Sequence, residues 1–181
     1  PVIPLLACAS GAAMTGLTDR PRAVRIITSC LVAGALLSSW RYHPHHLAWF
    51  NVLAGGPLGG RQHLIDSNLD WGQDLYRAKA IADRHPHEPL WLAYFGQVNP
   101  RAVGLLSQGP PPPRLVPGLY LVSVNFLMGR PWVVRDGSGK MRPVNFEEFG
   151  GFRQLTPVEH VGYSIDLYRV TEADLGPSPV P

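Results

Sequence analysis

The run "LWLAYF", residues 90–95, decides the fold class of this chain. It is apolar without interruption and has the length of a strand, which is typical of a strand buried on both faces. "LYLVSVNF", residues 119–126, also predicts a strand, and "HLID", residues 63–66, predicts a short one. Between them, residues 71–84 predict a helix with one apolar face, formed by Trp71, Leu75, Ala78 and Ala82.

Two further segments complete the predicted domain. "NPRAVGLL", residues 99–106, predicts a short helix with Asn99 as N-cap and Pro100 at its first position. "VGYSIDLYRV", residues 161–170, alternates between apolar and polar residues and predicts a half-buried strand at a sheet edge. The order strand–helix–strand–helix–strand places the fold in the α/β class. We expect a small three-layer-like α/β domain over residues 63–171, with a mainly parallel sheet and an antiparallel edge strand, and a disordered tail over residues 172–181.

Apolar residues are concentrated before this domain. Residues 1–17 and 26–40 contain no charged side chain, and charged residues make up only 16% of the whole chain, against about 25% in typical soluble domains. Both runs approach the roughly 17–25 residues that a spanning helix needs. We therefore predict two transmembrane helices over residues 1–41, as the last spans of a larger membrane domain. A pair of buried helices in a soluble protein is the alternative.

The short segment between the two runs predicts the orientation. It holds Arg20, Arg22 and Arg25 against a single acidic residue, Asp19. Positively charged loops stay in the cytoplasm, so the second helix would exit on the other side. Everything after about Tyr42 is then expected outside the cytoplasm, with the bilayer as a partner of the chain.

Residues 42–62 predict a connector at the membrane surface. Apolar residues at Leu47, Phe50 and Leu53 fit a short interfacial helix. The neighbouring histidines, His43, His45 and His46, have no standard zinc spacing, and we expect them in the headgroup layer. The net charge of +3 is small and the arginines are spread along the chain, which gives no nucleic-acid footprint.

The most polar stretch is "DSNLDWGQDL", residues 66–75. A calcium loop is disfavoured there, because the position of the closing carboxylate is occupied by Arg77. Asp70 followed by Gln73 matches a capping box, with Asp70 as N-cap of the predicted helix. We therefore predict a helix cap at Asp70 and Gln73, and no metal.

Capping does not account for the start of the stretch. Ligand sites in α/β folds lie at the carboxyl ends of strands, where several polar side chains are expected to meet. The predicted ligand or acceptor pocket consists of Asp66, Ser67, Asn68, Tyr94, Gln97 and Asn125.

Five segments from about Tyr42 to Val170 also resemble a known family. In chain order they are "YHPHHLAWFNVLAGGPLGG", "HLIDSNLDWGQDL", "LWLAYFGQVNP", "PGLYLVSVN" and "GYSIDLYRV". Together they resemble the C-terminal end of bacterial multi-spanning glycosyltransferases of the GT-C class. These are related to the dolichyl-phosphate-mannose protein mannosyltransferases and to the aminoarabinose transferases that act on lipid A.

The resemblance implies an enzyme of the bacterial inner membrane that transfers a sugar from a polyprenyl-phosphate donor to an extracytoplasmic acceptor. The family's catalytic carboxylate lies in the first extracytoplasmic loop, which this sequence does not contain. No catalytic residue is therefore assigned to this chain, and no cofactor beyond the polyprenyl-phosphate-linked sugar used by the full-length enzyme. A membrane-anchored extracytoplasmic binding module without transferase activity is the alternative.

Overall fold

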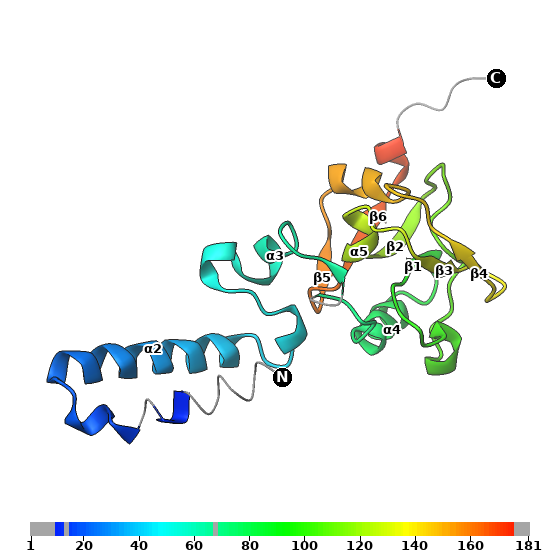
Figure 1. Cartoon of the computed structure of the whole chain (residues 1–181). Helices are drawn as coiled ribbons and strands as arrows, with labels where there is room; N and C mark the ends of the chain where they lie inside the picture. Colours follow the sequence, from blue (N-terminus) through cyan, green and yellow to red (C-terminus); the bar gives the residue numbers. More distant parts are fainter. Residues whose placement is uncertain (1–9, 13–14, 67–68, 176–181) are drawn as a thin grey trace, which may run out of the picture. The chain divides into compact units, whose positions relative to one another are not determined.

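A computed structural model describes residues 10–12, 15–66 and 69–175. The chain divides into two compact units, Pro1–Pro44 and His45–Pro181 (Figure 1).

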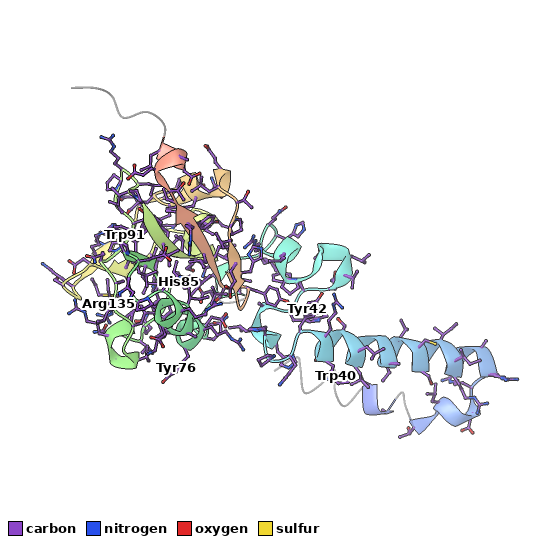
Figure 2. All side chains as sticks on the ribbon, turned by 180° about the vertical axis from the view of Figure 1, so that it is seen from behind. Trp40, Tyr42, Tyr76, His85, Trp91 and Arg135 are labelled. Carbon is purple, nitrogen blue, oxygen red and sulfur yellow. The ribbon has the colours of Figure 1, made fainter. Side chains whose placement is uncertain are left out.

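The first unit is dominated by one helix, α2, Arg22–Arg41, preceded by the 3-10 helix η1, Leu17–Asp19. Helix α2 begins directly after Pro21 and has no buried residue. Its 20 residues are apolar enough to cross a membrane by length and composition, since 20 residues of helix span about 30 Å. Trp40 extends from its last turn and Tyr42 follows it (Figure 2).

Of the two predicted spans, the described part of the chain contains one. Most of the other span falls on residues 1–9 and 13–14, which lie outside the described residues. The expectation of a spanning helix is therefore supported for α2 alone.

The second unit is built on a four-stranded sheet in the order β1-β2-β6-β5. The strands are β1, Leu90–Ala93; β2, Gly118–Ser123; β5, Glu159–Val161; and β6, Ile165–Val170. Only β1 and β2 pair in parallel, whereas β6 is antiparallel to both β2 and β5. The prediction of a mixed α/β sheet is confirmed, and the prediction that it is mainly parallel is wrong.

One reason is that residues 63–66 form no strand, and the other is a chain reversal inside the segment predicted as one edge strand. Gly162 and Tyr163 have φ angles of 62° and 72°, and the turn joins β5 and β6 as a hairpin with Val161 opposite Ile165. This hairpin places β6 in the sheet interior, with β5 at the edge. The alternating segment 161–170 therefore contains the end of β5, a turn and β6, rather than one edge strand.

Both faces of the sheet are covered, which gives three layers (Figure 1). On one face, Leu75, Ala78 and Ile81 of helix α4, Leu75–Arg84, pack on side chains that include Leu119 and Leu121. On the other face, Tyr120 and Val122 pack against residues from three elements. These are α5, Val124–Leu127; η6, Gly150–Gln154; and β3, Val133–Arg135, which pairs with β4, Met141–Pro143, in a two-stranded sheet.

Some predicted boundaries are wrong. Helix α4 begins at Leu75, not at Trp71, and its buried face includes Ile81. Residues 63–66 form no strand; instead, the NH groups of His63 and Leu64 donate to the carbonyl of Gly60 in a turn. The predicted short helix is confirmed as η5, Pro100–Val103, with the side chain of Asn99 accepting from the NH of Arg101.

Four further short helices lie in the described second unit. They are η2, His46–Ala48; η3, Val52–Ala54; α3, Gly56–Gly60; and η7, Glu172–Leu175. The predicted disordered tail is therefore ordered at residues 172–175, and residues 176–181 lie outside the described part of the chain.

Candidate functional site

Asp66 lies beside the carboxyl end of β2. Its NH donates to the Oδ1 atom of Asn125 at 2.6 Å, and Asn125 belongs to α5, which follows β2 directly. Asp66 has a φ angle of 72°, a left-handed conformation that Asp tolerates better than most residues. The contact with Asn125 therefore fixes the backbone of Asp66 and leaves its carboxylate available to other groups.

That carboxylate pairs with Arg130. The distance from an Asp66 carboxylate oxygen to an Arg130 guanidinium nitrogen is 2.7 Å, and the two side chains are 39% and 33% exposed. Among the described residues, the buried Nε atom of Arg130 and the Nδ2 atom of Asn125 have no hydrogen-bond partner. Two donors thus remain unused around a half-exposed carboxylate.

A cleft of about 310 Å³ opens at this place, which we name the strand-end cleft. Its lining combines three polar side chains with three aromatic ones and one glycine: Asp66, Gln97, Arg130, Trp71, Phe95, Trp132 and Gly96. The indoles of Trp71 and Trp132 are 66% and 42% exposed. The ring of Phe95 contacts those of Trp132 and Phe126, with centroids 5.8 Å and 5.6 Å apart, so core packing positions one aromatic wall.

The structure brings together part of the predicted pocket. Asp66 and Gln97 line the strand-end cleft, and Asn125 contacts Asp66 from beneath. Ser67 and Asn68 lie outside the described residues. Tyr94 does not line the cleft, because it is buried and its hydroxyl donates to the carbonyl of Gly72 at 2.9 Å.

Sequence reasoning missed Trp71, Arg130 and Trp132 as site residues. Trp71 was assigned to the buried face of a helix, but it stands in the turn before α4 and is exposed. Arg130 and Trp132 lie in the segment between α5 and β3, which carries no motif. A tryptophan inside the most polar stretch of the chain was the one available signal.

Asp70 is buried, in contrast to Asp66. Its carboxylate accepts from the NH of Gly72 at 2.7 Å and from the hydroxyl of Ser123 at 2.5 Å. Burial raises the pKa of Asp70 to about 7, and the nearby carboxylate of Asp74 adds to the rise. Burial and the charge of Asp70 likewise raise the pKa of Tyr94 to about 12.

Asp70 is therefore not the N-cap of α4, and the predicted capping box is wrong. The residue at the N-cap position is Asp74. Gly72 has a φ angle of 83°, which is incompatible with a helix that continues through it. The side chain of Gln73 instead stabilises the turn before the helix. It accepts a hydrogen bond from the NH of Trp71 and donates one to the carbonyl of Leu69.

Asp74 ties this turn to the β5–β6 hairpin. It accepts from the hydroxyl of Ser164 at 2.7 Å, with Arg77 Nε at 3.3 Å and His45 Nδ1 at 3.7 Å. Burial raises the pKa of Asp74, although Ser164, His45 and Arg77 oppose the rise. A Cβ atom at Gly162 would collide with the Asp74 carboxylate, so the hairpin approaches Asp74 as closely as glycine allows.

Each of the three carboxylates in this stretch thus has a different partner. Asp66 faces Arg130, Asp70 faces Ser123, and Asp74 faces Ser164. Within the described ranges there is no group of three or more His, Cys, Asp or Glu side chains arranged to hold a metal ion.

The strand-end cleft is suited to a small polar ligand with an apolar face. Indole rings offer flat apolar surface, whereas the carboxylate, guanidinium and amide groups supply directional hydrogen bonds. Ligand sites commonly combine an apolar lining with a few convergent polar groups. Comparison of this chain with family models, curated proteins and solved structures found no match to any of them.

Proposed function

We propose that this chain is the C-terminal part of an integral-membrane glycosyltransferase, and that its folded unit binds a glycan in the strand-end cleft. The observation that carries the proposal is the cleft itself, whose lining combines Trp71 and Trp132 with Asp66, Gln97 and Arg130. The resemblance of "DSNLDWGQDL", which contains Asp66 and Trp71, and of "YHPHHLAWFN" to membrane glycosyltransferases supports the same function.

A sugar ring has both an apolar face and polar hydroxyls, and this lining offers groups that suit each of them. The C–H face of a pyranose packs on an aromatic ring, and its hydroxyls both donate and accept hydrogen bonds. The carboxylate of Asp66 accepts, the guanidinium of Arg130 donates, and the amide of Gln97 does both. The cleft is therefore expected to select neutral polyhydroxylated ligands over purely apolar ones.

In this proposal the folded unit lies outside the cytoplasm and acts on the acceptor side. The orientation rests on the arginines at positions 20, 22 and 25 before α2. An alkaline phosphatase reporter fused after Val170 should then be active in bacterial cells. Activity of a cytoplasmic reporter alone at that position would contradict the orientation.

Ligand binding tests the cleft. Isothermal titration of the chain in detergent, with a panel of monosaccharides and short oligosaccharides, should detect binding that Trp71→Ala or Trp132→Ala weakens by about tenfold, equivalent to about 1.4 kcal/mol. Tyr76→Ala is the matched control, because Tyr76 is an exposed aromatic residue on α4 outside the cleft. Loss of binding in all three variants, or no binding by the parent chain, would contradict the assignment.

Transfer of a sugar tests the wider function. Because the expected catalytic carboxylate lies outside this sequence, the chain alone should show no turnover with polyprenyl-phosphate sugars, whereas an intact enzyme should lose turnover on Trp71→Ala. The alternative, a membrane-anchored binding module without transferase activity, is distinguished by the gene upstream of Pro1. Further spans with an acidic first outer loop support the enzyme, and a start codon just upstream supports the module.

A further inference from the structure

We propose that residues 47–58, here named the apolar loop, insert into the lipid bilayer and attach the second unit to the membrane at a second point, in addition to α2. The apolar loop, "LAWFNVLAGGPL", contains no charged residue. It comprises the last two residues of η2, all of η3 and the start of α3, coloured cyan in Figure 1. The proposal rests on α2 crossing the membrane and does not depend on glycan binding.

The apolar loop exposes an unusual amount of hydrophobic surface. Leu53 is 99% exposed and Val52 is 77% exposed, and Leu47, Trp49 and Leu58 are each 40–43% exposed. Single exposed apolar residues are common on soluble proteins, but a concentrated group marks a surface that contacts a partner or a membrane.

The loop holds these side chains outward in a defined way. Ala48 is buried, and Phe50 packs so closely on Gly60 that a Cβ atom there would collide with its ring. Those two residues face inward, whereas Val52 and Leu53 form the tip. The sequence predicted Leu47, Phe50 and Leu53 on one helical face; the structure instead directs Phe50 to the core.

The backbone directly after the tip is paired within the loop. Unpaired backbone NH groups are costly in lipid, and the three that follow Leu53 have local acceptors. The Oδ1 atom of Asn51 accepts from the NH of Ala54 at 2.9 Å, and the NH groups of Gly55 and Gly56 donate to the carbonyls of Val52 and Asn51. The 3-10 turn therefore lowers the number of backbone donors that would need a partner in lipid.

The bilayer is the expected partner because α2 would cross it close in sequence to the apolar loop. Leu53 follows Arg41, the last residue of α2, by twelve residues, which span at most about 43 Å. A membrane crossed by α2 is therefore within reach of the loop tip. Trp49 adds an indole, the side chain preferred where membrane meets water.

Depth-dependent quenching tests the insertion. Cys8→Ser and Cys30→Ser remove the native thiols, Leu53→Cys carries an NBD fluorophore, and the full chain is reconstituted in phosphatidylcholine–phosphatidylglycerol vesicles. Lipids spin-labelled at the headgroup or along the acyl chain should quench this fluorophore at least about threefold more than one at Leu106→Cys, with the strongest effect near the headgroup–acyl boundary. Leu106 is the matched control, because it is 72% exposed and lies outside the apolar loop.

A fluorophore on native Cys30, within α2, verifies insertion of the chain. Strong quenching at Cys30 with none at Leu53 overturns the proposal, as does equal quenching at Leu53 and Leu106. Efficient disulfide formation between two Leu53→Cys chains in the vesicles would also overturn it, because the loop would then contact a second copy. Loss of glycan binding alone would leave the quenching result unchanged, so the two proposals fail separately.

Discussion

Asp66 and the pair Asp70 and Asp74 belong to one ten-residue stretch, yet they occupy opposite environments. Asp66 is 39% exposed and pairs with Arg130 at the rim of the strand-end cleft. Asp70 and Asp74 are 0% and 2% exposed and accept hydrogen bonds from the serines at positions 123 and 164. The residue type is the same in each case, so burial and partners alone separate the two environments.

The difference separates what holds the fold from what is available to a ligand. A buried carboxylate already surrounded by donors cannot change partners without leaving one of them unsatisfied. A half-exposed carboxylate exchanges solvent for a ligand at little structural cost. We therefore expect changes at Asp70 and Asp74 to alter stability, and changes at Asp66 to alter binding.

Asp74→Ala is expected to have the largest effect. It leaves the buried hydroxyl of Ser164 without its acceptor and removes the carboxylate beside Arg77. The free energy of unfolding should fall by about 3 kcal/mol, measured by urea denaturation of the chain in detergent. Asp74→Asn keeps an oxygen acceptor for Ser164 and should recover most of the loss. If the alanine variant is as stable as the parent, Asp74 is not a structural carboxylate.

Gly162→Ala should destabilise the same contact from the hairpin side. The added Cβ meets the Asp74 carboxylate, and the φ angle of 62° disfavours a side chain, so we expect a loss of about 2 kcal/mol. Gly139→Ala is the matched control: its φ is 89° and no atom lies within 4 Å of its Cβ position, so it reports backbone strain alone. Equal losses in a denaturation experiment would mean that the collision with Asp74 contributes nothing.

Stability should fall as pH rises, because the folded state binds a proton at Asp70 more tightly than the unfolded state. The pKa of Asp70 is about 7 when folded, against 3.8 as the reference value. Its contribution is fully present below the unfolded pKa and is lost as pH rises through the folded pKa. Between about pH 4 and 7, the free energy of unfolding should decline by up to about 1.4 kcal/mol per pH unit.

Asp70→Asn provides the control for this pH dependence. An amide keeps an acceptor for the NH of Gly72 and gains a donor for Ser123, but it does not titrate. Urea denaturation at several pH values should therefore show a flatter profile for this variant. A slope identical to that of the parent would assign the pH dependence to other groups.

Asp66→Asn is expected to have the smallest effect on stability. Asn also tolerates the left-handed backbone at this position, and a half-exposed ion pair contributes only about 0–1 kcal/mol. On the proposed function, glycan affinity measured by titration should nevertheless fall, because the amide loses one acceptor oxygen. If the variant were strongly destabilised, Asp66 would be a structural carboxylate like Asp70 and Asp74. The contrast between structural and ligand-accessible carboxylates would then be wrong.

Local patterns in the sequence were sufficient for several elements. The continuous apolar run at residues 90–95 and the run at 119–126 correspond to β1 and to β2 with the start of α5. Asn99 before Pro100 correctly marked the start of η5. These predictions succeed because burial on both faces and helix initiation depend on neighbouring side chains. Asp66, Gln97 and Asn125 were also expected to be neighbours, and they are, but residues 63–66 do not form the strand from which Asp66 was placed.

The direction of β6, the role of Asp70 and the walls of the strand-end cleft were decided only by tertiary structure. The sheet became mainly antiparallel because the chain reverses at Gly162, and alternating apolar residues look the same on either side of such a turn. Asp70 matched a capping box, but its partner Ser123 lies 53 residues away and Asp74's partner Ser164 lies 90 residues away. Hydrogen bonds over such separations depend on how the strands pair. The sequence alone therefore predicted which segments are buried more reliably than it predicted which polar groups bond to each other.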